Sequence, residues 1–382
     1  MSIYFDYAAT TPTDPRVITA MLTCLEKTET FGNPASTHSY GQQAALKIEE
    51  ARAHVANLLN ADPREIIWTS GATESNNLGI QGVAHFYQKR KKHIITMKTE
   101  HKAVLDVCQF LEKQGFEVSY LAPHPNGLID LSQLRKALRS DTLLVSIMMV
   151  NNETGIIQPI EKIATIVKEN GSFLHVDAAQ AVGKVEIDLK KLPIDLLSLS
   201  AHKIYGPKGV GALVVKHRPA VRLEPLLYGG GHEKGLRSGT LATHQIVGLG
   251  EACAILQEKM KNEITQIRTL KESFWEKIKR IADVHKNGAN EDKKTHACHI
   301  LNVHFSEIDS DILMRALPEL AISSGSACTS LSIRPSHVLQ AMGLSDEWAH
   351  RSLRFSFGRF TTEDEIERAA QLFTTIFKKL RK

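Results

Sequence analysis

Residues 173–203 read FLHVDAAQAVGKVEIDLKKLPIDLLSLSAHK and contain two short, mainly apolar runs, Phe173–Val176 and Leu196–Leu199. Runs that are apolar throughout, instead of alternating with polar residues, are typical of strands buried on both faces of a parallel sheet. Similar runs lie on either side, at Ile66–Thr69, His93–Thr96, Val118–Leu121, Leu143–Val150 and Val210–Val215. Amphipathic segments such as Gln43–Leu59 and Ile160–Glu169 separate them. The pattern predicts an open α/β sheet with helices on both faces.

The last third of the chain has a different pattern. Apolar side chains recur every three or four residues from Leu256 to Ile281, which predicts one long amphipathic helix that ends before the polar loop 286–294. We expect this helix to connect a large domain to a smaller one. Thr362 and Glu365 have the spacing of a capping box, which predicts the start of a final helix.

Composition excludes several classes of protein. The 382 residues are 42% hydrophobic and 23% charged, a balance that argues against disorder. A net charge of +5 is too small for this length to indicate nucleic-acid binding. The longest apolar stretch, Leu143–Val150, is too short to span a membrane, and the start MSIYFDYAATTP lacks the basic segment of a secretory signal. Five cysteines without a C-x-x-C pair favour a reduced, cytoplasmic protein.

Polar residues follow four of the predicted strands. The carboxyl ends of strands in open α/β sheets are where ligands bind, so these residues are candidates for a site. They are Ser70–Ser75, Asn151–Gly155, Asp177–Gln180 and Ser200–Lys203. The first of them runs from a strand into a helix through Gly and small hydroxyl residues, which suits a phosphate. Read alone, it is better explained as an ordinary strand-to-helix turn with an N-cap.

Lys203 and Asp177 add chemistry to this edge. An ammonium group directly after an apolar run is partly desolvated, which lowers its pKa and suits it to form a Schiff base. An aspartate at a neighbouring strand end is suited to hold a pyridinium nitrogen, and the combination with a phosphate cup is typical of pyridoxal phosphate sites. His101 follows the run HIIT on the same edge and is a candidate for stacking or proton transfer. Each residue taken singly could also be a capping, turn or surface residue.

Cys328 lies in SSGSACTS, residues 323–330, a run of small side chains that cannot anchor a core. We expect an exposed, mobile loop whose thiol becomes a thiolate nucleophile. The other four cysteines are predicted to pack in the interior. Four possible metal ligands, His296, Cys298, His299 and His304, occur in a strand-like run whose side chains alternate between faces, so a zinc site is not favoured.

Ten segments between about Phe5 and Phe360 resemble, in matching order, motifs of the cysteine desulfurases: FDYAATTP, FGNPAS, TSGATESNN, TEHKAVL, VNNETG, VDAAQAVGK, SAHKIYGPKG, GGGHEKGLRSGT, SSGSACTS and RFSFGR. The chain most resembles the housekeeping branch for iron–sulfur cluster assembly, because its cysteine lies in a long SSGSACTS segment. The resemblance implies the fold type I of pyridoxal phosphate-dependent transferases. Residues 15–258 would form a large domain with a mostly parallel seven-stranded sheet. Residues 1–14 and 259–382 would form a smaller α/β domain with the mobile cysteine loop at about 323–335.

The resemblance also implies roles for individual residues. Lys203 would carry pyridoxal 5'-phosphate as a Schiff base, Asp177 would bind the ring nitrogen and Gln180 the ring hydroxyl. His101 would stack on the ring, with Asn152 close to both ring and substrate, and Arg354 would pair with the substrate carboxylate. The phosphate would be held by residues of two strand-end turns and by one residue of the other subunit of a homodimer: Ala72, Thr73, Ser200, His202 and Thr240.

The implied reaction converts L-cysteine to L-alanine and leaves the sulfur on Cys328 as a persulfide. The sulfur would then pass to an iron–sulfur scaffold protein or to sulfur-relay proteins, for cluster assembly and tRNA thiolation. No membrane, nucleic acid or resident metal is implied, although Cys328 would transiently ligate a nascent cluster. Housekeeping desulfurases usually continue beyond the position of FKKLRK in a tail that helps to bind the scaffold.

Two kinds of alternative stay open at this point. A selenocysteine lyase or another fold type I enzyme such as an aminotransferase would share the cofactor site, and an aminotransferase would not need Cys328. A non-catalytic sulfur-carrier subunit on the same fold would tolerate loss of Lys203 and would be colourless when purified.

Overall fold

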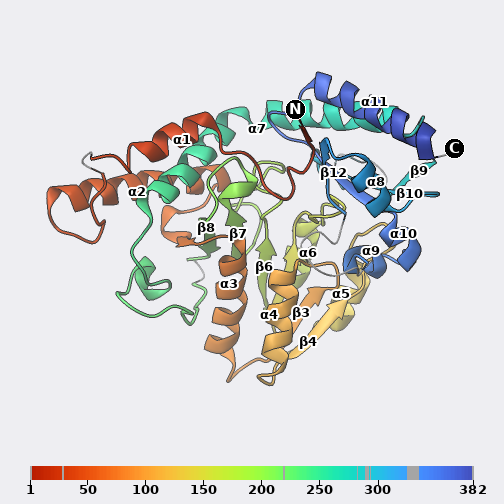
Figure 1. The fold of residues 1–382 in the computed structure, drawn as a ribbon. Coiled ribbons are helices and arrows are strands. Elements are labelled where there is room, and N and C mark those ends of the chain that lie inside the picture. Colours follow the sequence, from red (N-terminus) through yellow and green to blue (C-terminus); the bar gives the residue numbers. More distant parts are fainter. Residues whose placement is uncertain are drawn as a thin grey trace.

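The computed structural model of the chain describes residues 2–27, 30–217, 220–281, 283–288, 292, 294–324 and 335–380. Its largest element is a seven-stranded sheet in which every strand coincides closely with a predicted apolar run (Figure 1). In spatial order the strands are β2 (Ile66–Thr69), β8 (Gly211–Val215), β7 (Leu196–Ser200), β6 (Phe173–Asp177), β5 (Thr142–Met148), β3 (His93–Met97) and β4 (Glu117–Leu121).

The sheet is mostly parallel, as predicted. Only β8 runs antiparallel to its neighbours β2 and β7, whereas β7, β6, β5, β3 and β4 are parallel. Because β8 is antiparallel to both of its neighbours, β2 runs in the same direction as β7. The carboxyl ends of β2, β5, β6 and β7 therefore lie at one edge of the sheet, where the sequence analysis places the site.

Helices cover both faces of this sheet, and each face has its own apolar cluster. On one face, α3 (Ala72–Tyr87) and α4 (Lys102–Glu112) bury residues such as Leu78 and Val104. The helices that pack in the other cluster are α1 (Pro15–Leu22), α2 (Ser39–Leu59), α5 (Leu131–Ala137), α6 (Ile160–Glu169) and the first half of α7 (Thr243–Ile278). The predicted three-layer α/β arrangement is confirmed.

Helix α7 has 36 residues and begins at Thr243, well before the predicted start at Leu256. Its first turns contain Gly248 and Gly250, which interrupt the apolar repeat. A Cβ atom at Gly250 would come within 2.5 Å of Ala51 on α2, so glycine is required for these two helices to pack closely. The glycines that allow this close packing interrupt the apolar repeat, so the repeat did not predict the first turns of the helix.

The large sheet and the helices that cover it form one body of the protein. The N-terminal strand, the second half of α7 and the elements after it form a second body around their own apolar cluster, and this body contains two small sheets. Strands β12 (Ser352–Ser356), β10 (Ile300–Phe305) and β9 (Val284–Lys286) form an antiparallel sheet, and β1 (Ile3–Tyr4) pairs with β11 (Leu320–Ala321). The remaining elements are α8 (Ser310–Ala316), α9 (His337–Ala341), α10 (Asp346–His350), α11 (Glu363–Leu380) and the short 3-10 turns η1 (Pro63–Glu65), η2 (Ala201–Lys203) and η3 (Glu233–Gly235).

The N-terminus and the C-terminal third share one core. Ile3 and Phe5 pack in a cluster with the second half of α7, β10, β12 and α11. Figure 1 shows α7 running along the top of the molecule to lie beside α11. The predicted capping box of α11 is present, because the backbone N–H groups of Thr362 and Glu365 each donate to the other residue's side chain. The domain boundaries given above remain a prediction.

A buried ion-pair network joins the two bodies. Arg359 donates to Asp14 at 2.6 Å and to Glu263 on α7 at 2.8 Å, and its guanidinium lies 4.1 Å from the ring centre of Tyr205. These charged side chains are almost fully enclosed. Within the described residues, no helix is both long and apolar enough to cross a membrane.

Candidate active site

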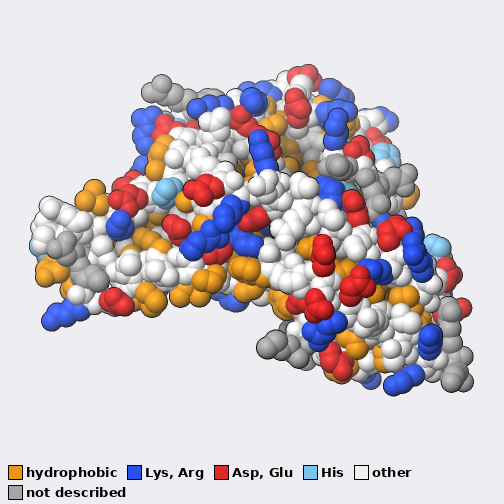
Figure 2. Space-filling view, turned by 90° about the horizontal axis from the view of Figure 1, so that it is seen from above, with side chains coloured by type: hydrophobic (Ala, Val, Ile, Leu, Met, Phe, Trp, Pro, Cys, Tyr) orange, Lys and Arg blue, Asp and Glu red, His pale blue; other side chains and the backbone are white. Residues whose placement is uncertain are grey.

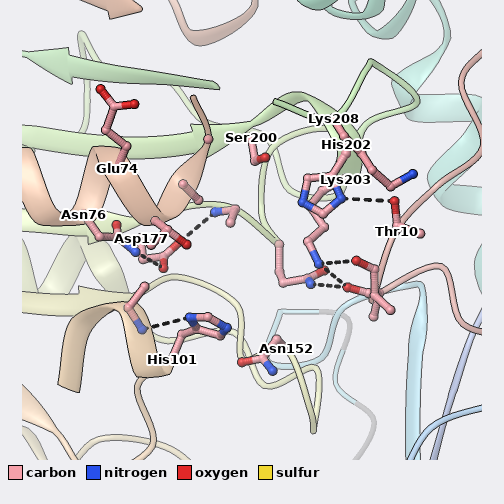
Figure 3. Close-up of a pocket in the computed structure, with 18 of the residues that line it drawn as sticks. Thr10, Glu74, Asn76, His101, Asn152, Asp177, Ser200, His202, Lys203 and Lys208 are labelled. Carbon is pink, nitrogen blue, oxygen red and sulfur yellow. Dashed lines mark hydrogen bonds between the residues drawn. The ribbon is translucent and has the colours of Figure 1, made fainter. Parts of the chain in front are cut away.

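A cavity of about 490 Å³ opens at the carboxyl edge of the large sheet (Figure 3). Its size falls in the range of small-molecule sites. The predicted residues that line it are Ala72, Thr73, His101, Asn152, Asp177, Gln180, Ser200, His202, Lys203 and Arg354. The structure therefore brings together side chains from β6, β7, β12 and the starts of α3 and α4.

One end of the cavity is the start of α3. Gly71 precedes this helix with φ = 152°, and among the described residues no side chain caps its first turn. The backbone N–H groups at Ala72 and Thr73 are thus available to an anion, with the positive end of the helix dipole behind them. Gly211 lies beneath this turn, where a Cβ atom would come within 2.7 Å of the Gly71 Cα.

Glu74, in the first turn of α3, also lines the cavity. Burial raises the pKa of its carboxyl, but hydrogen bonds from Arg237 and Ser70 outweigh this and leave the pKa below its ordinary value. Arg237 therefore offsets a negative charge close to the anion-binding turn. Thr240, three residues further along, is exposed and does not line this cavity.

Asp177 ends β6 and is buried at the floor of the cavity. Its Oδ2 accepts a hydrogen bond of 2.7 Å from Asn76 Nδ2 on α3, and its Oδ1 accepts one of 2.9 Å from the backbone N–H of Ala179. Neutral donors hold this carboxylate in place. The group is suited to stabilise a positively charged nitrogen placed above it.

Lys203 projects into the cavity from η2, directly after β7. Its Nζ donates to the backbone carbonyls of Ala8 at 2.6 Å and Ala9 at 2.7 Å. The segment 8–10 thus crosses the site next to the lysine, as Figure 3 shows for Thr10. Its carbonyl groups position the amine without neutralising it.

His101 caps α4, and its Nδ1 accepts the backbone N–H of Ala103 at 3.1 Å. Burial lowers the pKa of the ring; the charge of Asp177 opposes this shift and that of Lys203 adds to it. The ring is therefore neutral near pH 7. Because Nδ1 is an acceptor, the single ring proton is on Nε2. Figure 3 shows the ring beside Asn152.

His202 directly precedes Lys203 in η2, and its Nδ1 lies 3.1 Å from Thr10 Oγ1. Burial, together with the charges of Lys203 and Lys208, lowers the pKa of its ring to about 4. A neutral imidazole here can exchange hydrogen bonds with a ligand without adding charge.

Arg354, on β12, reaches the cavity from the second body. It donates from Nη2 to Asp6 at 2.8 Å and from Nη1 to the backbone carbonyl of Asn152 at 2.9 Å. Its Nε is buried and has no partner among the described residues. Because Arg354 also lines the cavity, its guanidinium is suited to bind an acidic group of a ligand.

Several parts of the site were not assigned from the sequence. Asn76, Asp6 and the carbonyls of Ala8 and Ala9 hold the functional side chains, yet none was assigned a role. The motif FDYAATTP indicated that this segment matters. The contacts themselves could not be predicted, because a backbone carbonyl is the same in every residue type. Cys328 lies outside the described residues, so its predicted role is untested. Cys24, Cys108, Cys253 and Cys298 are buried, as predicted.

Comparison with known proteins identifies close relatives. The model of the aminotransferase class-V family matches residues 3–369. A protein from Shewanella piezotolerans named cysteine desulfurase IscS is 56% identical over all of this chain and 94% of its own length, and one of the same name from Proteus mirabilis is equally similar. A solved NifS-like protein superposes with a TM-score of 0.92 at 37% identity, covering 99% of this chain and all of its own. A structure described as SspA in complex with cysteine gives 0.83 at 40% identity, over 94% and 100% of the two chains.

Proposed function

The chain belongs to the class-V aminotransferase family, within its cysteine desulfurases, and from that premise we propose that it converts L-cysteine to L-alanine and takes up the sulfur on Cys328. One observation supports this most strongly. A lysine, a buried aspartate, a neutral histidine and an arginine with an unpartnered Nε line one cavity beside an uncapped helix start. An aminotransferase and a selenocysteine lyase share most of this set, but the curated relatives at 56% identity carry the desulfurase name.

The residues present fit pyridoxal 5'-phosphate. The start of α3, with Ala72, Thr73, Ser200 and His202, would hold the phosphate, and Thr240 of the partner subunit would complete that end. Asp177 would hold a proton on the ring nitrogen, and Gln180 would bind the ring hydroxyl. His101 would stack on the ring, and Lys203 Nζ would bond to the cofactor covalently. When bound, the cofactor supplies an electron sink for negative charge at the substrate α-carbon.

The protein's own groups would carry out the remaining steps. Arg354 would bind the substrate carboxylate and fix the α-carbon near Lys203, with Asn152 beside it. Once substrate occupies the site, the Lys203 amine would remove the α-proton and later return a proton to carbon. His101 lines the same cavity, and its Nε2–H would supply a proton during these transfers.

Sulfur transfer would occur on Cys328. Its thiolate would attack the substrate sulfur, forming the S–S bond while the Cβ–S bond breaks and its electron pair stays on carbon, where a proton is added. The products are L-alanine and a Cys328 persulfide, so no external oxidant is needed. We propose that scaffold and sulfur-relay proteins then receive this sulfur for cluster assembly and tRNA thiolation.

The test is release of alanine and sulfide from L-cysteine in the presence of a reductant. Wild type should form both, Cys328→Ser should form neither, and Lys203→Ala should also be inactive. Equal sulfide release by wild type and Cys328→Ser would refute persulfide chemistry and favour an elimination reaction. A yellow wild-type protein with no activity on cysteine would refute the proposed substrate.

We also propose a homodimer. Large apolar side chains are exposed along α1, the segment after it and α2, and others in the segment that precedes Thr240: Ile18, Leu22, Leu25, Phe31, Tyr40, Leu46, Leu227 and Tyr228. Figure 2 shows hydrophobic side chains along the arm of the molecule at the left, where α1 and α2 lie. Light scattering should give twice the chain mass of 42.4 kDa, and a monomer would refute this part of the proposal.

A further inference from the structure

A hydrogen-bonded pair at the edge of the cavity links the two bodies of the protein. Gln180 follows β6, whereas His299 directly precedes β10. Both are buried, and His299 Nε2 lies 3.2 Å from Gln180 Oε1. The other end of the amide is fixed as well, because Gln180 Nε2 donates to the backbone carbonyl of Ala8 at 2.8 Å. Gln180 itself lines the cavity.

These contacts define the orientation of the amide. A backbone carbonyl only accepts hydrogen bonds, so the –NH₂ group of Gln180 must face Ala8. The amide oxygen then faces His299, and since this oxygen also only accepts, the imidazole must carry a proton on Nε2. One proton of the –NH₂ group is used by Ala8. The other is available to a ligand in the cavity.

The surroundings of His299 are consistent with this tautomer. The pKa of the ring lies well below its ordinary value, mainly through burial and further through the positive charges of Lys184 and Lys271. The ring is therefore neutral and has one proton. Its Nδ1 is buried without a partner among the described residues. A buried unpartnered nitrogen destabilises the fold, so packing alone would be better served by an apolar ring of similar size.

We propose that His299 is a positioning residue, whose Nε2–H holds the Gln180 amide so that an N–H of Gln180 faces the ring hydroxyl of the cofactor. The inference rests on the proposed function, which places that hydroxyl next to Gln180. An N–H donor stabilises the deprotonated, negatively charged state of the hydroxyl oxygen. The oxygen then holds the neighbouring proton of the lysine-linked cofactor less tightly, so the pKa of that proton is lower than it would be without the donor.

The first test follows the absorbance of bound pyridoxal phosphate against pH in the full-length protein. In His299→Phe the pH at the midpoint of this absorbance change should rise by about one unit. This is the size expected for loss of a hydrogen bond to a charged group. In His299→Gln the new amide can donate to Gln180, so the midpoint should lie close to that of the wild type. His304→Phe is the matched control, because His304 is also buried, has an unpartnered Nε2 and bonds to Asn287 away from the cavity.

The outcomes separate this inference from the proposed function. An unchanged midpoint in His299→Phe together with a shifted one in Gln180→Leu would overturn the role of His299 and leave the cofactor site intact. An equal shift in His304→Phe would attribute the effect to general loosening and would also overturn it. If wild type failed to bind pyridoxal phosphate, the proposed function would fail as well.

A second test needs neither the cofactor nor a variant. The ¹⁵N chemical shifts of the His299 ring, in cofactor-free protein labelled at histidine, report which nitrogen carries the proton. The inference requires protonated Nε2 and unprotonated Nδ1. The opposite tautomer would overturn it even if every desulfurase assay succeeded.

Discussion

His175 makes the stability of the folded protein sensitive to acid. It lies on β6, two residues before Asp177, and is fully buried. Its Nδ1 is 2.8 Å from Ser146 Oγ and its Nε2 2.9 Å from Ser198 Oγ, so serines of the two adjacent strands bracket the ring. Burial lowers the pKa of this imidazole to about 4, although the charge of Asp177 opposes the shift.

The sign follows from where protons bind. Between pH 6.5 and pH 4 the unfolded chain protonates this histidine and the folded chain does not, so the free energy of unfolding falls as pH falls through this window. The pKa difference of about 2.5 units corresponds to about 3 kcal/mol once both states are protonated, and to about 2 kcal/mol at pH 5. Above pH 6.5 the contribution is fully present.

The measurement is urea unfolding, followed by circular dichroism, of wild type and His175→Gln between pH 8 and pH 5. The glutamine cannot take up a proton, so the difference between the two proteins should shrink by about 2 kcal/mol over this range. Taking the difference cancels the contributions of the other histidines. A difference that stays constant with pH would refute the reasoning, and His175→Asn serves if the glutamine variant does not fold.

Three further predictions concern other parts of the molecule. Asp177→Asn keeps the size of the side chain but removes its charge, so the rate of alanine formation should fall by about 100-fold or more, and a fall below tenfold would contradict its role. Arg359→Gln breaks the buried network between the two bodies and should lower the free energy of unfolding by about 3–5 kcal/mol in urea, whereas a loss below 1 kcal/mol would mean that the network adds little. Ser336→Ala removes the cap of α9 and also a 2.5 Å hydrogen bond to the buried Glu153, so it should lower the free energy of unfolding by about 2–3 kcal/mol in thermal unfolding. The control Ser345→Ala removes only the cap of α10 and should lower it by about 1 kcal/mol. Equal losses would show that the bond to Glu153 contributes nothing.

Much of this architecture could be predicted from the sequence, because burial on both faces makes a strand visible as an apolar run. The runs at Phe173–Val176 and Leu196–Leu199 became β6 and β7, and the parallel register placed Asp177 and Lys203 at one edge. The reversed direction of β8 was not predicted, since an apolar run such as Val210–Val215 reads alike in both directions. The early start of α7 was missed because glycines at a close helix contact weaken the apolar repeat.

What the sequence could not provide was the set of contacts that hold the functional groups. The bond between His299 and Gln180 joins residues 119 positions apart, and neither residue type predicts the other. His299 was considered only as an unfavoured metal ligand in a strand-like run. Its actual neighbour depends on how the β10 sheet packs against the loop after β6, which is a property of the tertiary structure.

The N-terminal segment shows why the two bodies must be considered together. Phe5 packs in the core of the second body, while the carbonyls of Ala8 and Ala9, a few residues later, hold Lys203 of the first. Between them, Asp6 pairs with Arg354 on β12. The carbonyl of Ala8 also receives the Gln180 amide, whose other end meets His299. A shift of the second body against the large sheet would therefore displace the lysine, the arginine and the amide together, so the relative placement of the two bodies is itself part of the site.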